Sequence, residues 1–408
     1  MTCDVTDASA VAARVRALVP PPESVSDSVR EIVGAVAQGG DRALLELEQC
    51  FGGSGLPLRV ESHELQAARD SLDPAVRRGL ETAIANVGEV ARAGVSSDLD
   101  VTLSQGHSVR LREVPVRRAA VYAPGGAHPY PSSVVMGVIT AQAAGVDHVV
   151  VAAPAHPIIL GACALCGADE VYRMGGAQAI AALAYGTETI PPVDVIVGPG
   201  NLYVQEAKVQ VSNRVGIEGF AGPSDLCIVA SAGADPEPLA LDLLAQAEHG
   251  KDSVAVAVSD DPRLVQALCE SLRVDVAGRV AVVEATDSVV ALAFAEAFAP
   301  EHLQLVGSDA ELLAPRVRNA GCVLVGSYSA TAFSDYVAGS NHTLPTDGRA
   351  RFASGLTVKH FRRSMSEIRL NEQSADELGV AGVPIAQAEG FQYHAASMQA
   401  RMRERLAS

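Results

Sequence analysis

The chain has 408 residues, of which 48% are hydrophobic, and this length and composition predict a folded protein with two or more domains. The formal net charge of −17 argues against nucleic-acid binding, because phosphate recognition depends on clustered Lys and Arg side chains. The N-terminus lacks the basic start and apolar core of a signal peptide, and prolines interrupt the longest uncharged stretch, 149–168. We therefore expect a cytoplasmic protein without a membrane span, whose 7 cysteines are reduced.

Two helices are predicted in the first quarter of the chain, at residues 28–51 and 73–93. We expect residues 1–110 to form a helical part that packs against a sheet, and we assign it to the domain formed by residues 230–355.

From about residue 118, short Val- and Ile-rich runs alternate with Ala- and Leu-rich helical stretches. Each run is almost continuously apolar, as expected of parallel strands that are covered on both faces. The predicted strands are residues 119–123, 148–153, 170–174, 193–198, 226–231, 253–259, 280–285, 302–307 and 322–327. This alternation predicts an α/β fold with right-handed crossovers.

Two glycine-containing segments, 121–133 and 193–208, each connect a predicted strand to a predicted helix. At such turns, backbone N–H groups and the start of the helix can bind a phosphate. Gly198 and Gly200 lack the third glycine of a GxGxxG motif. Taken alone, these fragments are better explained as tight turns without a ligand.

Residues 236–249 are predicted to form one helix that begins after Asp235. Its Leu and Ala residues suit a packed interior. Asp242, Gln246 and His249, however, are spaced i, i+4, i+7 and therefore share one face. A polar stripe on such a helix indicates a function.

Glu301 and His302 stand side by side just ahead of a predicted strand. A histidine can accept a proton from an alcohol, and a carboxylate can orient or deprotonate water. An exposed Glu beside a capping His explains this fragment equally well.

The segment 328–352 is long and polar for a loop, and loops of this size in compact domains are often functional. Its Asp335 and His342, together with Gln246 and His249, provide oxygen and nitrogen ligands that suit zinc or manganese. Convergence of these residues in space is a separate question that the sequence leaves open.

After about residue 355 the chain becomes polar and helical. This tail is too short for a core of its own, so we expect it to bury its apolar side against another surface, such as a second subunit.

Several segments, in order from about residue 30 to the C-terminus, resemble the histidinol dehydrogenase family. They are YAPGG…YPSS (122–133), GGAQAIAALAYGTETIP (175–191), IVGPGNLYV (196–204), AGPSD (221–225), DLLAQAEHG (242–250), PEHL (300–303), SDYVAGSNHTLPT (334–346), RFASGL (351–356) and EGFQYHA (389–395). The resemblance implies two Rossmann-like parallel-sheet domains, which are incomplete dinucleotide-binding folds, at 111–229 and 230–355. It also implies small helical N-terminal and C-terminal extensions, of which the latter, at 356–408, contacts the partner subunit.

The resemblance further implies a homodimeric enzyme that oxidises L-histidinol to L-histidine through L-histidinal, in the last steps of histidine biosynthesis. It uses NAD and one zinc ion per subunit, which manganese can replace. Glu301 and His302 match the catalytic pair. The residues that match metal ligands are Gln246, His249, Asp335 and His394, the last reaching the neighbouring subunit's site. The residues that match substrate contacts are Ser224, Gln246, His249, His302, Asp335, His342, Glu389 and His394. Those that match NAD contacts are Tyr122, Gln178 and Asn201.

The chain departs from the family pattern at three places. Asp225 stands where Glu is usual, Gly137 replaces a common Asn, and residues 217–220 are less apolar than expected. None of these changes removes a matched ligand or the catalytic pair. A paralogous dehydrogenase of another small alcohol on the same fold is the main alternative, and a zinc hydrolase that uses Glu301 is a more distant one.

Overall fold

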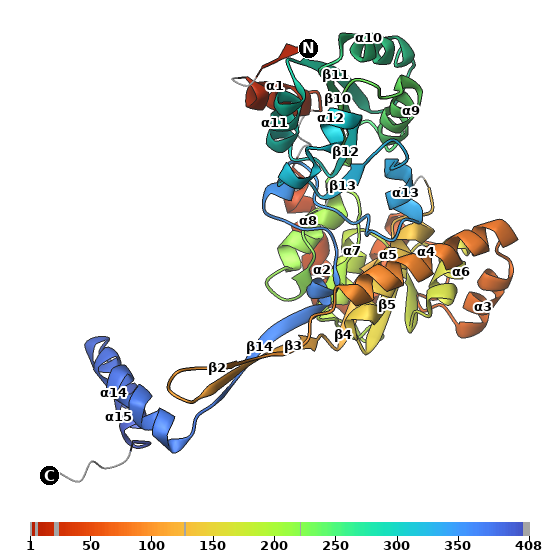
Figure 1. Ribbon diagram of the computed structural model, residues 1–408. Coiled ribbons are helices and arrows are strands. Elements are labelled where there is room, and N and C mark those ends of the chain that lie inside the picture. Colours follow the sequence, from red (N-terminus) through yellow and green to blue (C-terminus); the bar gives the residue numbers. More distant parts are fainter. Residues whose placement is uncertain (1, 5–6, 20–23, 126–127, 221, 403–408) are drawn as a thin grey trace. The chain divides into compact units, whose positions relative to one another are not determined.

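The computed structural model describes residues 2–4, 7–19, 24–125, 128–220 and 222–402 (Figure 1). The chain forms two compact units. The first comprises residues 1–94 and 116–361, and the second comprises residues 95–115 and 362–408.

The first unit contains two parallel sheets. The strands of the first sheet, in spatial order, are β6 (Glu170–Arg173), β5 (His148–Ala153), β4 (Arg118–Tyr122), β7 (Val195–Val197) and β8 (Gly216–Ile217). Its connecting helices are α5 (Pro131–Ala144), α6 (Pro157–Cys166), α7 (Gly176–Tyr185) and α8 (Leu202–Val211). Helices α5 and α6 cover one face and α7 and α8 the other, which explains why the strands are apolar on both faces.

The N-terminal helices are α1 (Ala8–Arg16), α2 (Ser26–Cys50), α3 (Ser62–Asp70) and α4 (Pro74–Ala93). Residues 1–110 were expected to pack on the second sheet's domain, but α2 contacts α7 and α8, α3 contacts α6, and α4 contacts α5. The reason is that Val36 and Leu44 of α2 and Val87 of α4 are buried in the two apolar cores of the first sheet. The described residues of α1, by contrast, pack against α11 on the second sheet.

The second sheet is also parallel throughout. Its strands, in spatial order, are β1 (Thr2–Cys3), β11 (Arg279–Ala285), β10 (Val254–Ser259), β9 (Asp225–Ala230), β12 (His302–Val306) and β13 (Cys322–Val325). Its helices are α9 (Pro236–Ala247), α10 (Pro262–Ser271), α11 (Ser288–Phe298), α12 (Ser308–Glu311) and α13 (Thr331–Tyr336). Helices α9 and α10 cover one face, and α1 and α11 cover the other. Short 3-10 turns follow at Ala314–Arg316, Arg349–Arg351 and Val358–Phe361.

The second unit is an antiparallel sheet with two helices. Its elements are β14 (Arg362–Arg369), β3 (Ser108–Pro115), β2 (Leu99–Thr102), α14 (Glu372–Ala388) and α15 (Gln392–Gln399). The sequence pattern predicts a helical tail and no strands here. These strands are mostly exposed or half-buried, so they lack the apolar runs that identified the other strands.

The nine predicted strands are all present, as β4 to β7 and β9 to β13, which confirms the α/β fold with two parallel sheets. The helix predicted at residues 236–249 is α9, but it ends at Ala247, so His249 lies beyond its last turn. Within the described part of the chain, no helix is long and apolar enough to cross a membrane.

Candidate functional site

The candidate catalytic residues gather at the amino ends of β9 and β12, which are neighbouring parallel strands. Ser224 precedes β9, Glu301 precedes β12, and His302 is the first residue of β12, opposite Leu226. Because amino ends of parallel strands meet at one edge, residues 77 positions apart, such as Ser224 and Glu301, come into contact.

Glu301 is buried, with only 6% of its surface exposed. Its Oε2 accepts hydrogen bonds from the hydroxyl of Ser224 and from the backbone N–H of Asp225, the latter at 3.1 Å. Burial raises the pKa of the Glu301 carboxyl to about 7, although the nearby His302 opposes the rise. A carboxyl with this pKa can exchange a proton at neutral pH.

His302 lies between two carboxyl groups. Its Nε2 is 3.3 Å from Oδ1 of Asp335, and its Nδ1 is 3.9 Å from Oε2 of Glu301. Neither ring nitrogen has a hydrogen bond of good geometry among the described residues. Burial alone would lower the pKa of His302, but Asp335 and Glu301 together raise it above the ordinary value. The imidazole is therefore suited to accept a proton.

Of the residues predicted to bind a metal ion, Gln246, His249 and Asp335 belong to the first unit. Nδ1 of His249 lies 3.1 Å from the carbonyl oxygen of Ala245, which can only accept, so this nitrogen donates and Nε2 keeps its lone pair. Gln246 is buried at the end of α9, and its amide nitrogen has no partner in the described structure. Burial would raise the pKa of Asp335, but His302, with smaller effects of His342 and His249, lowers it.

The described residues do not contain three His, Cys, Asp or Glu side chains placed to share a metal ion. Of the predicted metal ligands, His249 and Asp335 are of these residue types and lie in the first unit, as does Gln246, which is an amide. Glu389, which follows α14, and His394 in α15 belong to the second unit.

His342 links the loop after α13 to the first sheet. Its Nδ1 donates to the carbonyl oxygen of Asp335 at 2.8 Å, and its Nε2 lies 3.3 Å from the hydroxyl of Ser133 on α5. Asn341 donates to the carbonyl oxygen of Met136, at 3.0 Å, on the same helix. Burial lowers the pKa of His342. Ser133 was not predicted as a site residue, although it lies within the YPSS motif.

The residues that match NAD contacts lie on the first sheet. The hydroxyl of Tyr122, at the carboxyl end of β4, accepts the backbone N–H of Gly176 at 3.1 Å. Gln178 on α7 donates to Glu48 at 2.9 Å, and Glu48 also accepts the N–H of Gly175 at 3.0 Å. Tyr122 and Gln178 therefore converge on the turn that starts α7.

Asn201 caps the next helix, α8, and its side-chain oxygen accepts the N–H of Val204 at 3.2 Å. The carboxyl ends of β4 and β7 lie at the point where the strand order reverses, which is where open α/β sheets bind ligands. This edge is a suitable place for a nucleotide.

The turn before α8 depends on a buried ion pair that the sequence analysis missed. Lys208 is fully buried, and its Nζ donates to Glu218 at 2.7 Å and to the carbonyl oxygen of Gly198 at 3.1 Å. Glu218 also accepts the N–H of Gly198 at 2.7 Å. Gly198 has φ 122°, and a Cβ atom there would overlap the carbonyl oxygen of Tyr122, so glycine is required.

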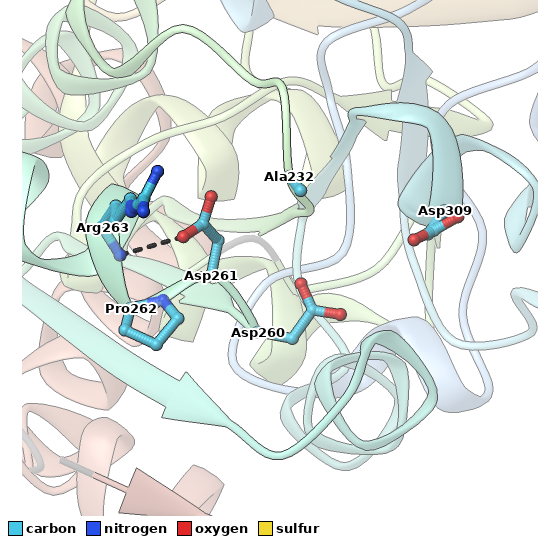
Figure 2. A pocket seen from close by; sticks show the side chains of 6 residues that line it. All are labelled: Ala232, Asp260, Asp261, Pro262, Arg263 and Asp309. Carbon is cyan, nitrogen blue, oxygen red and sulfur yellow. Dashed lines mark hydrogen bonds between the residues drawn. The ribbon is translucent and has the colours of Figure 1, made fainter.

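A cavity of about 350 Å³ lies at the opposite edge of the second sheet, where β9, β10 and β12 end (Figure 2). It is lined by Ala232, Asp260, Asp261, Pro262, Arg263 and Asp309. Asp261 caps α10 by accepting the N–H of Arg263 at 2.9 Å. None of the residues predicted for the site lines this cavity, and its three carboxyl groups are unfavourable for a phosphate.

Comparison with known proteins supports the sequence resemblance. The sequence model of the histidinol dehydrogenase family matches residues 20–402. The histidinol dehydrogenase of Haloarcula marismortui is 41% identical over 397 residues, which cover 93% of this chain and 94% of the relative. That of Streptomyces avermitilis is 39% identical and covers 92% of this chain and 90% of the relative.

A solved structure gives the same result. The crystal structure of histidinol dehydrogenase from Elizabethkingia anophelis superposes with a TM-score of 0.87 at 29% identity, and covers 94% of this chain and 93% of that chain. The match of the family over nearly the whole chain, in sequence and in fold, shows that the protein belongs to the histidinol dehydrogenase family.

Proposed function

We propose that the protein oxidises L-histidinol to L-histidine in two successive steps through L-histidinal, with NAD as the oxidant and one zinc ion per subunit. The observation that carries this proposal is the buried pair of Glu301 and His302 beside Asp335. Membership of the family supports histidinol as the alcohol that is oxidised.

Gln246, His249 and Asp335 suit a zinc ion, or manganese in its place. Imidazole nitrogen, carboxylate oxygen and amide oxygen together form a ligand set that both ions accept. The available Nε2 of His249 supports this assignment. We assign the fourth ligand to the partner subunit's His394. A metal ion held there would orient the substrate by binding the imidazole and amino nitrogens of L-histidinol.

His302 acts on the alcohol. It accepts the hydroxyl proton in the first step, and the Asp335 carboxylate, 3.3 Å away, stabilises the resulting imidazolium. Because neither ring nitrogen has a well-formed hydrogen bond among the described residues, a substrate hydroxyl can approach one of them.

Glu301 acts on the aldehyde. Its pKa of about 7 lets it accept a proton from the water that adds to L-histidinal. The hydrogen bonds from Ser224 and Asp225 both reach Oε2, and Oε1 has no such bond within the described structure. Oε1 is therefore the oxygen that faces the water.

Tyr122, Gln178 and Asn201 form the NAD site at the carboxyl edge of the first sheet. NAD held there would supply the hydride acceptor for each oxidation. The N-terminus of α8, which Asn201 caps, offers backbone N–H groups to the diphosphate. The remaining substrate contacts are assigned to Ser224, His342 and the partner subunit's Glu389, within a homodimer.

A comparison of substrates tests this proposal. Purified protein is mixed with NAD and either L-histidinol or L-phenylalaninol, which has the same amino alcohol but no imidazole nitrogen. L-histidinol is expected to give NADH at least about 1000-fold faster, because a site built to bind polar nitrogens rejects an analogue that lacks them. Equal rates, or NADH from another small alcohol only, would indicate a paralogous dehydrogenase. No NADH from any alcohol would refute a dehydrogenase activity.

A further inference from the structure

Arg16, the last residue of α1, reaches the segment that leads into the catalytic pair. Its Nε donates to the carbonyl oxygen of Phe298 at 3.2 Å, and its Nη2 donates to Phe298 and, at 3.4 Å, to Ala299. The guanidinium also lies over the Phe298 ring, 4.0 Å from its centroid. The family match begins at residue 20, so α1 lies outside it.

The same guanidinium is paired with Asp225. Nη1 of Arg16 lies 3.1 Å from Oδ2 of Asp225, which is almost completely buried. The other oxygen of Asp225, Oδ1, accepts the backbone N–H of Glu301 at 2.8 Å. In return, the N–H of Asp225 donates to the Glu301 carboxylate at 3.1 Å. A continuous set of hydrogen bonds thus connects α1 to both the backbone and the side chain of Glu301.

Two strained backbone positions lie within this set. Ala299 has φ 47° and Asp347 has φ 55°, and they are the non-glycine residues with positive φ in the described part of the chain. Ala299 offers its carbonyl oxygen to Arg16, and Asp347 donates its N–H to Asp225 at 3.1 Å. Such conformations persist only where surrounding contacts enforce them, and here Arg16 and Asp225 provide those contacts.

We propose that Arg16 and Asp225 are positioning residues. They fix the backbone conformation at Ala299 and thereby the placement of Glu301 and His302. The first helix is then a part of the active-site framework although it contains none of the predicted site residues. A small displacement of a catalytic group is costly in rate, so loss of either residue acts on turnover more than on binding. This inference rests on the proposed oxidation of L-histidinol.

The test compares Arg16→Met, Arg16→Lys and Asp225→Asn in the full-length protein with L-histidinol and NAD. Arg16→Met is expected to lower kcat by about 10- to 100-fold and to change KM for either substrate by less than about threefold. Lys restores a cation to Asp225 but lacks the planar fork with which Arg16 reaches Asp225 and the two carbonyl oxygens together, so Arg16→Lys is expected to recover part of the lost kcat.

Two matched controls separate positioning from general stability. Arg14 lies in the same last turn of α1 and is exposed, so Arg14→Met is expected to keep kcat within about twofold of the wild-type value. Asp347→Asn removes an exposed carboxylate that lies 3.8 Å from Arg16 but keeps the backbone N–H, and it is also expected to keep kcat. Thermal unfolding is measured for every variant, so that kcat is assayed at a temperature well below the melting midpoint of each.

The outcomes distinguish this inference from the proposed function. If the wild-type protein forms no NADH from L-histidinol, the proposed function fails. If it does, and kcat of Arg16→Met stays within about twofold or falls no further than that of Arg14→Met, the positioning role is overturned. If Arg16→Met does not fold, Asp225→Asn decides by the same criterion. In the double variant with Arg16→Met and Asp225→Asn, the fold loss of kcat is expected to be smaller than the product of the two single losses. A loss equal to that product would also overturn the positioning role.

Discussion

The hydroxyl of Ser224 donates a hydrogen bond to Oε2 of Glu301, the same oxygen that accepts the backbone N–H of Asp225. Burial favours the neutral form of this carboxyl group, whereas the neighbouring His302 and the hydrogen bond from Ser224 favour the ionised form. The balance leaves the Glu301 pKa at about 7, where the group can act as a base at neutral pH.

Ser224→Ala is expected to shift the pH dependence of L-histidinal oxidation. Removing the hydroxyl donor raises the Glu301 pKa further, so the pH of half-maximal rate increases by about one unit and the rate recovers in alkaline solution. Initial rates of NADH formation from L-histidinal between pH 6 and pH 10 measure the shift. Ser231→Ala, which removes a buried hydroxyl at the opposite edge of the same sheet, serves as the control. An unchanged midpoint in Ser224→Ala would contradict this role.

Relative to the wild type, Glu301→Gln is expected to become more stable as the pH rises, because the wild type loses stability. The carboxyl has an ordinary pKa of 4.5 and a folded-state pKa of about 7, so its contribution to stability is complete below pH 4.5 and is lost as the pH rises through 7. Glutamine does not ionise. The unfolding free energy of metal-free Glu301→Gln should therefore gain about 3 kcal/mol on the wild type between pH 4.5 and pH 8. Urea titrations at both pH values test this, and a difference independent of pH would refute the burial of Glu301.

The pair formed by Lys208 and Glu218 predicts a second stability effect. Lys208→Met leaves the Glu218 carboxylate buried without its cation and should cost about 3–5 kcal/mol of unfolding free energy. In the double variant with Glu218→Gln no charge is left, while the amide oxygen can still accept the N–H of Gly198. We expect that variant to recover about half of the loss by urea denaturation. If the double variant is as unstable as Lys208→Met alone, the ion pair does not determine the stability of this turn.

Mixed dimers test the assignment of His394 to the partner subunit's site. A dimer of one His302→Asn chain and one His394→Asn chain has one site with both defects and one site with neither, so about half of the wild-type activity returns. The two single-variant homodimers, mixed only after each is stabilised against exchange, serve as controls. If unfolding and refolding the mixture restores no activity, each His394 serves its own chain.

The apolar strands could be predicted from the sequence because parallel strands buried on both faces leave a continuous hydrophobic run. Glu301 and His302 could be recognised because reactive side chains stand next to such a strand, and Asp335 because it lies in a long polar segment. That segment was expected to be a loop throughout, but residues 331–336, which include Asp335, form α13. The contact of Ser224 with Glu301 follows from the sheet, since β9 and β12 are neighbouring parallel strands whose amino ends lie at the same edge.

Other features could not be predicted, for identifiable reasons. Glu48 meets Gln178 across 130 residues of sequence, and Arg16 meets Asp225 across 209 residues, so no local pattern reveals either pair. Lysine side chains are usually solvated, and only tertiary packing buries Lys208. The end of α9 was placed two residues too late because the residue before His249, Glu248, already forms the C-cap.

The most direct measurement of the central claim is the amount of NADH formed per L-histidinol when the substrate is limiting and NAD is in excess. The account predicts two NADH and one L-histidine, with no accumulated L-histidinal, since His302 and Glu301 serve successive oxidations in one site. A yield of one NADH with released L-histidinal, or no NADH at all, would contradict it.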